Sequence, residues 1–90
     1  MMKNLDELKD ILVGMGYEDT VVLENPDYLS AITGISENGR LIYSYDKMVE
    51  HLMETDEMNE EDAIEFIDFN TIRALPYMGD NAPIISYNLI

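Results

Sequence analysis

The sequence predicts an α+β fold, in which a small antiparallel sheet of three to four strands carries helices on one face. Three observations support this class. Apolar residues recur at helical spacing in several stretches, an Asn-Gly dipeptide joins two β-rich runs, and the elements follow the order α-β-β-β-α-α-β. Ninety residues provide one modest core, so we expect a single domain over residues 1–90.

The N-terminal half predicts one helix and three strands. Asn4 begins a capping-box pattern, and apolar residues follow it at helical spacing until glycines end the run. The β-branched run Thr20–Leu23 predicts a first strand. Tyr28–Ile35 and Arg40–Tyr43 predict a hairpin, because the Asn-Gly dipeptide at 38–39 between them accepts positive φ.

The C-terminal half predicts two helices and a last strand. Ser44 or Asp46 caps a helix whose predicted core stripe is Met48, Val49, Leu52 and Met53. Asn59 begins a second capping box, and acids fill the first turn of the helix that starts at Glu60. Ile84–Leu89 predicts the final strand.

The helical stretch before Pro76 leaves two alternatives open. On a straight helix, Asn70 would point into the apolar face, where an unpaired amide costs about 1–3 kcal/mol. A break near Asn70 would start a second short helix through Leu75, with the side chain of Asn70 or Thr71 as its cap. A continuous helix would instead leave Phe69 and Ile72 as an exposed contact patch. In both cases Pro76 is expected to end the helix near Leu75.

The composition is strongly acidic, with 19 acids, five lysines and arginines, and a net charge of −14 at pH 7. Direct binding to nucleic acid or to an anionic membrane surface is not expected, because both need Lys and Arg. A protein with a basic surface is the favoured partner, although acidity also serves solubility alone. The lack of cysteine, of a long apolar run and of a signal-peptide pattern predicts a cytoplasmic protein.

No catalytic motif accompanies these elements. His51, the only histidine, falls on the polar face of its helix beside Glu50, and no cysteine or Gly-x-Ser-x-Gly elbow accompanies it. The acids from Asp56 to Asp62 do not form an EF-hand, because Glu61 stands where that loop needs glycine, which leaves at most weak cation binding. We therefore expect no enzyme, no resident metal and no cofactor.

The spacing of the acids supplies a hypothesis about a partner. Two rows repeat every four residues, namely Asp46, Glu50 and Glu54, and then Glu57, Glu61 and Glu65 followed by Asp68. Because four helical residues rise about 6 Å, such rows would imitate the charges of a nucleic-acid backbone; the simpler interpretation is a solvated face. The predicted partner-binding residues are Glu54, Glu57, Glu61, Glu65 and Asp68 for steering, and Phe69, Ile72 and Arg73 as candidate anchors. A homodimer through an edge strand at 84–90 is the alternative.

Three strings resemble a family of small acidic bacterial proteins from phage-like mobile elements. They are Met48-Val49-Glu50, EEDAIEFIDFNTIRALPYMG and Ala82-Pro83-Ile84-Ile85, of which NTIRALPY is the most distinctive part. The resemblance covers roughly residues 32–85 and assigns neither an activity nor catalytic residues. A mobile-element origin implies, by analogy only, an inhibitor of a host defence protein.

Overall fold

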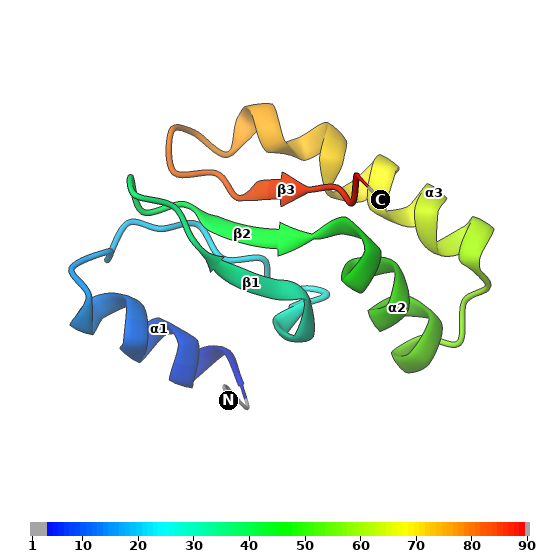
Figure 1. The fold of residues 1–90 in the computed structure, drawn as a ribbon, viewed down its shortest axis with the longest axis horizontal. Helices are drawn as coiled ribbons and strands as arrows, with labels where there is room; N and C mark the ends of the chain where they lie inside the picture. The colour runs from blue at the N-terminus through cyan, green and yellow to red at the C-terminus, as the bar shows by residue number, and fades with distance from the viewer. Residues whose placement is uncertain (1–3, 90) are drawn as a thin grey trace.

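The computed structural model describes residues 4–89 and shows an α+β fold, as predicted (Figure 1). The elements are α1 (Leu5–Gly14), η1 (Leu29–Ala31), β1 (Ile32–Ile35), β2 (Leu41–Ser44), α2 (Tyr45–Thr55), α3 (Glu60–Asn70), η2 (Ile72–Tyr77) and β3 (Ile84–Ser86). α2 and α3 lie beyond the end of β2, whereas α1 lies toward the other end of the long axis (Figure 1).

The sheet has three strands in the order β1-β2-β3. The predicted hairpin is confirmed: β1 and β2 pair antiparallel, with a bulge between Ile32 and Gly34, and Gly39 takes a φ of 80° in the turn. β3 pairs parallel to β2, with Ile42 opposite Ile84, so the sheet is mixed and not antiparallel as predicted. The two helices and η2 between these strands form the long crossover that a parallel pairing requires.

The predicted first strand, Thr20–Leu23, does not join the sheet. Its N–H groups have other acceptors: Val21 donates to the carbonyl of Asn81 at 3.3 Å, and Leu23 donates to the hydroxyl of Tyr43 at 3.1 Å. The predicted second strand also starts late. Tyr28 takes a left-handed backbone with φ 48°, and η1 follows it, so that β1 begins only at Ile32.

The three α-helices begin where their caps predict. The side chains of Asn4, Ser44 and Asn59 each accept a hydrogen bond from the backbone N–H three residues ahead, at 2.9, 3.4 and 2.8 Å. Each such cap is worth about 1 kcal/mol. The sequence therefore locates these helix starts correctly, because a cap depends only on neighbouring residues.

The break near Asn70 is confirmed, and the continuous helix is excluded. α3 ends at Asn70, and η2 follows as a 3₁₀ helix whose first carbonyl acceptor is Thr71. Neither predicted side-chain cap forms: the Asn70 amide donates back to the carbonyl of Phe66 at 3.0 Å, and η2 has no side-chain cap. Pro76 lies inside η2, which runs to Tyr77, so the helical segment extends two residues beyond its predicted end.

One hydrophobic core joins residues from all parts of the fold. Its fully buried members include Tyr43 on β2, Leu52 on α2 and Ile67 on α3, while α1 contributes Leu8 and Leu12. The predicted core stripe of α2 is correct except at its end. The Met53 side chain is 39% exposed, because it faces the opening between α2 and α3 rather than the sheet.

Candidate partner-binding surface

The five acids predicted to steer a partner are all exposed, and they lie on or between two neighbouring helices. They are Glu54 near the end of α2, Glu57 in the following loop, and Glu61, Glu65 and Asp68 on α3. Among residues 4–89, none of the four glutamates has an ion-pair or hydrogen-bond partner for its side chain. Their charges are therefore available to solvent and to another molecule.

The second predicted row of acids is not a single helical row. Glu57 precedes α3 and takes a left-handed backbone with φ 57°, so the helix carries only Glu61, Glu65 and Asp68. The first predicted row is helical throughout, because α2 spans Tyr45–Thr55 and contains all three of its acids. The structure thus holds one complete row on α2 and a shorter row on α3, with Glu57 between the helices.

Of the five acids predicted to steer a partner, Asp68 alone has a hydrogen-bond partner for its side chain within residues 4–89. The Tyr45 hydroxyl donates to its carboxylate at 2.8 Å, and the Tyr45 ring lies 5.0 Å from that of Tyr87. Burial, and then the hydrogen bond and charge of Asp68, raise the pKa of Tyr45 to about 12. The pair joins the start of α2 to the end of α3, so Asp68 has a structural role as well as a charge.

An apolar hollow lies on the acidic flank of α3. It has a volume of about 370 Å³ and is lined by Met58, Asp62, Glu65, Phe66 and Phe69. The Phe69 ring is 61% exposed, and the Arg73 guanidinium lies 4.9 Å from its centroid. The structure therefore brings a predicted steering acid, Glu65, together with a predicted anchor, Phe69.

The three candidate anchors have different surroundings. Phe69 is exposed, and Arg73 is exposed and stacked on it by a cation–π contact. Ile72 is half-buried and packs against the hydrophobic core, because the change to a 3₁₀ helix after Asn70 turns it inward. Of the three candidate anchors, Phe69 is therefore the one apolar side chain that is exposed to another molecule.

A second hollow separates α2 from α3. Its volume is about 310 Å³, and its lining is Tyr45, Asp46, Val49, Glu50, Met53, Glu60 and Ile64. Asp46 here accepts a hydrogen bond from the Asn88 amide at 2.8 Å, which ties the C-terminal segment to α2. This hollow repeats the pattern of the first one, with apolar side chains among exposed carboxylates.

The His51 side chain contacts two residues, Tyr28 and Ser30. Its ring lies 5.4 Å from the Tyr28 ring, and its Nδ1 lies 3.5 Å from the Ser30 hydroxyl, at the limit of a hydrogen bond. Neither His51 nor Ser30 lines the hollow on α3 or the hollow between α2 and α3. The contact with Tyr28, which belongs to the hydrophobic core, places the His51 ring at the edge of that core.

The Tyr28 hydroxyl is buried and has no hydrogen-bond partner among the described residues. Burial raises the pKa of Tyr28; the Thr71 side chain, which lies near but outside hydrogen-bond geometry, lowers it somewhat, and the charge of Asp56 raises it. The phenol therefore stays protonated at neutral pH, and its neighbours do not activate it.

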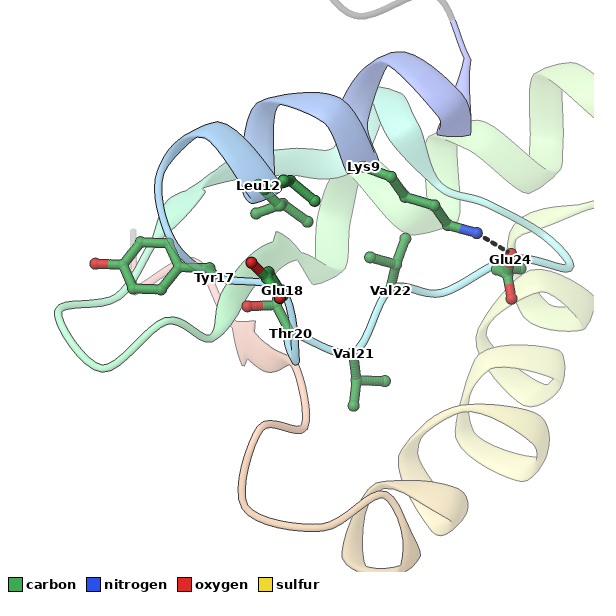
Figure 2. Close-up of a pocket in the computed structure, with 9 residues that line it drawn as sticks. Lys9, Leu12, Tyr17, Glu18, Thr20, Val21, Val22 and Glu24 are labelled. Carbon is green, nitrogen blue, oxygen red and sulfur yellow. Dashed lines mark hydrogen bonds and ion pairs between the residues drawn. The ribbon is translucent and has the colours of Figure 1, made fainter.

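The sequence did not predict a third hollow, which lies beside α1. About 440 Å³ in volume, it lies between α1 and the extended segment after it (Figure 2), lined by Lys9, Leu12, Val13, Tyr17, Glu18, Thr20, Val21, Val22 and Glu24. Lys9 and Glu24 form an ion pair at 2.9 Å. One sequence signal was available: α1 carries more apolar residues than one stripe needs, and Ile11, Val13 and Met15 are indeed exposed.

Two further features bear on partners. Within residues 4–89, no three His, Asp or Glu side chains converge as metal ligands would. In the same range, no helix combines the length and the apolar character that crossing a membrane requires.

Comparisons of the chain with protein-family models, with curated proteins and with solved structures find no match. The resemblance to mobile-element proteins therefore stays a prediction. No relative supplies a residue role, and the surface is judged by its own geometry.

Proposed function

We propose that this chain is a small acidic protein-binding module whose partner is a protein with a basic surface, such as a nucleic-acid-handling enzyme. The observation that carries the proposal is the exposed set of acids on α2, α3 and the loop between them. Within residues 4–89, Glu54, Glu57, Glu61 and Glu65 have no ion-pair or hydrogen-bond partner for their side chains. Lys47 is the only lysine or arginine in residues 45–70. A surface of one sign attracts an oppositely charged patch and speeds encounter.

Charge alone gives encounter more than affinity, so a buried apolar contact is also needed. Phe69 is suited to this role, because its ring is exposed beside Glu65 and lines the hollow on α3. Arg73 already lies on the Phe69 ring, which shows that a guanidinium can stack there. A partner arginine would gain the same contact together with a carboxylate within the hollow.

Imitation of nucleic acid is the finer form of the proposal. The acids of α2 repeat every four residues, which corresponds to a rise of about 6 Å along the helix. A protein groove that binds phosphates would meet carboxylates in a regular series. The resemblance to phage-like mobile-element proteins favours a host nucleic-acid-handling protein as the target, by analogy only.

We further propose that the protein acts by stoichiometric binding and not by catalysis. His51→Ala should leave its function intact, because the ring packs on Tyr28 and its Nδ1 lies 3.5 Å from the Ser30 hydroxyl, at the limit of a hydrogen bond. An inhibitor titrates its target near one to one, whereas an enzyme acts at far lower ratios. Loss of function in a stably folded His51→Ala variant would reverse this view.

A homo-oligomer through β3 is the second candidate, and its position at the edge of the sheet favours it. The strand Ile84–Ser86 offers an unpaired edge, and beyond it Tyr87 is 59% and Leu89 is 99% exposed. Light scattering decides the matter. A monomer at high micromolar concentration would remove this candidate.

The experiment for the main proposal is affinity capture from a lysate of the source cell with three baits. The first is the unaltered protein, and the second carries Glu57→Lys, Glu61→Lys and Glu65→Lys. The third is a matched control with Asp19→Lys, Glu37→Lys and Asp80→Lys, which changes the net charge equally at exposed positions elsewhere. A basic protein retained by the first and third baits and lost from the second supports the proposal. Equal capture by all three would contradict it.

A further inference from the structure

We infer that the extended segment Thr20–Glu24, together with the groove beneath α1, binds an extended basic peptide segment of another protein by adding it as a β-strand. This surface is separate from the acids of α2 and α3, and the inference does not depend on the function proposed for them.

The backbone of this segment is paired on one side only. Val21 and Leu23 direct their N–H groups inward, to Asn81 and to the Tyr43 hydroxyl. In an extended chain the next residue points its N–H and C=O the other way, so Val22 and Glu24 present theirs on the opposite edge. Within residues 4–89, neither of those N–H groups has a hydrogen-bond partner. An edge of this kind is a template for another strand.

The groove provides contacts for the side chains of such a strand. Figure 2 shows Val22 pointing toward α1 and its Leu12, whereas Val21 points away. Leu12, Val13 and Val22 line the groove of about 440 Å³. A strand added beside Val22 would place every second side chain on this same face, under α1. One helix flanking an open strand edge gives both backbone pairing and side-chain selection.

The charges around the groove select a cationic peptide. Glu18 and Glu24 are exposed on its rim, and Asp6 and Asp10 are exposed on α1. The single cation in the lining, Lys9, already forms an ion pair with Glu24. A strand that alternates small β-branched residues with Lys or Arg therefore complements both the groove and its rim.

The segment is also held in place before anything binds. Besides the two inward hydrogen bonds, the Thr20 hydroxyl donates to the carbonyl of Gly39 at 2.6 Å, and the Asn81 amide donates to the carbonyl of Asp19 at 3.2 Å. These contacts join the segment to the hairpin turn and to the loop before β3. A fixed edge loses little conformational entropy on binding, which favours affinity.

The test uses the whole, isotope-labelled protein and a capped hexapeptide that alternates Lys with Val. Amide spectra should shift most strongly at Val22 and Glu24, and more there than anywhere in α2 or α3. Two further peptides carry N-methyl groups on all Lys amides or on all Val amides, and so block opposite edges of the strand. One of them should bind about tenfold more weakly, because it loses two or more hydrogen bonds, and the other should bind unchanged.

Two variants of α1 supply a matched control. Val13→Trp fills the groove and should weaken peptide binding about tenfold or more, whereas Ile11→Trp, at an exposed position that does not line the groove, should not. Both positions are exposed, so neither change should unfold the protein.

Several results would overturn the inference. The first is the absence of a shift at Val22 and Glu24 with millimolar peptide, and the second is an equal response to both methylated peptides. The third is protection of the Val22 amide that rises with protein concentration in the absence of peptide, because a second copy of the chain would then be the occupant. Shifts confined to α2 and α3 would also refute this site, while supporting the separate proposal for those helices.

Discussion

Two acidic helical regions of this chain present different surfaces. α1 buries only Leu8 and Leu12 and exposes the large apolar side chains of Ile11 and Val13, and its C-cap residue Met15 is exposed as well. α2 and α3 pack against each other, and the side they expose is dominated by carboxylates. Both regions share the excess of acids, so net charge alone does not distinguish them. What each helix packs against decides whether it offers apolar contact or charge.

The α1 side faces a segment of extended chain and a groove, whereas the α2–α3 side faces mainly solvent. We therefore expect recognition at α1 to depend on backbone pairing and shape, and recognition at α2–α3 to depend on salt. The following changes sharpen or break this contrast, in order of expected effect.

Removal of a buried leucine should cost more on α2 than on α1. Leu52→Ala should lower the free energy of unfolding by about 3–5 kcal/mol, because the side chain is 0% exposed and leaves a closed cavity. Leu12→Ala should cost about 2–3 kcal/mol, since Leu12 lines an open groove where water can enter. Urea unfolding measures both. An equal or larger loss at Leu12 would contradict the view that α1 is the more loosely packed helix.

Tyr43→Phe should destabilise the fold by about 1–2 kcal/mol. The buried hydroxyl accepts from the Leu23 N–H, and without it that donor is left unpaired. Burial raises the pKa of Tyr43 to about 12, as expected for a phenol enclosed in the core. Hydrogen exchange should speed up first at Leu23, beside α1, and leave α3 protected. Uniform loss of protection would mean that Tyr43 does not hold this segment specifically.

Alkaline pH should weaken the junction of α2 with α3. Tyr45 has a raised pKa of about 12 in the folded state, against about 10 when unfolded, so the folded state favours the protonated phenol. Its contribution to stability is complete below pH about 10 and is lost as the pH rises to about 12. Tyr45→Phe should lose the hydrogen bond to Asp68 and show a smaller decline over this range. A decline that is identical in both proteins would exclude Tyr45 as its source.

Features set by neighbouring residues were predictable from the sequence. The three helix caps, the Asn-Gly hairpin and the break near Asn70 follow from local chemistry, and all are present. Thr20–Leu23 has the composition of a strand but lies outside the sheet, because its acceptors are a loop carbonyl and a tyrosine hydroxyl. These hydrogen-bond acceptors are distant in sequence, and the hydrophobic periodicity of the segment does not predict them.

The candidate site was predictable to a similar degree. The exposure of the steering acids on α2 and α3 follows from helical spacing. The exposure of Phe69 was expected only for a continuous helix, and it occurs despite the break because α3 runs past Phe69 to Asn70. The inward turn of Ile72 depends on the 3₁₀ geometry of η2, and the parallel placement of β3 depends on the path of a long crossover. The groove under α1 needs both α1 and the unpaired segment in place, so it became visible only in three dimensions.

The central claim is that the position of the acids on α2 and α3, and not the total charge, governs binding to a basic partner. The direct measurement is the association rate of the captured partner between about 0.05 and 0.5 M salt. It compares the unaltered protein with the reversal of Glu57, Glu61 and Glu65 to lysine and with the control reversal of Asp19, Glu37 and Asp80 to lysine. The unaltered protein and the control should associate at least about tenfold faster at low salt than at high salt. The reversal of Glu57, Glu61 and Glu65 should lose that dependence. A rate indifferent to salt, or equally reduced by both reversals, would contradict the claim.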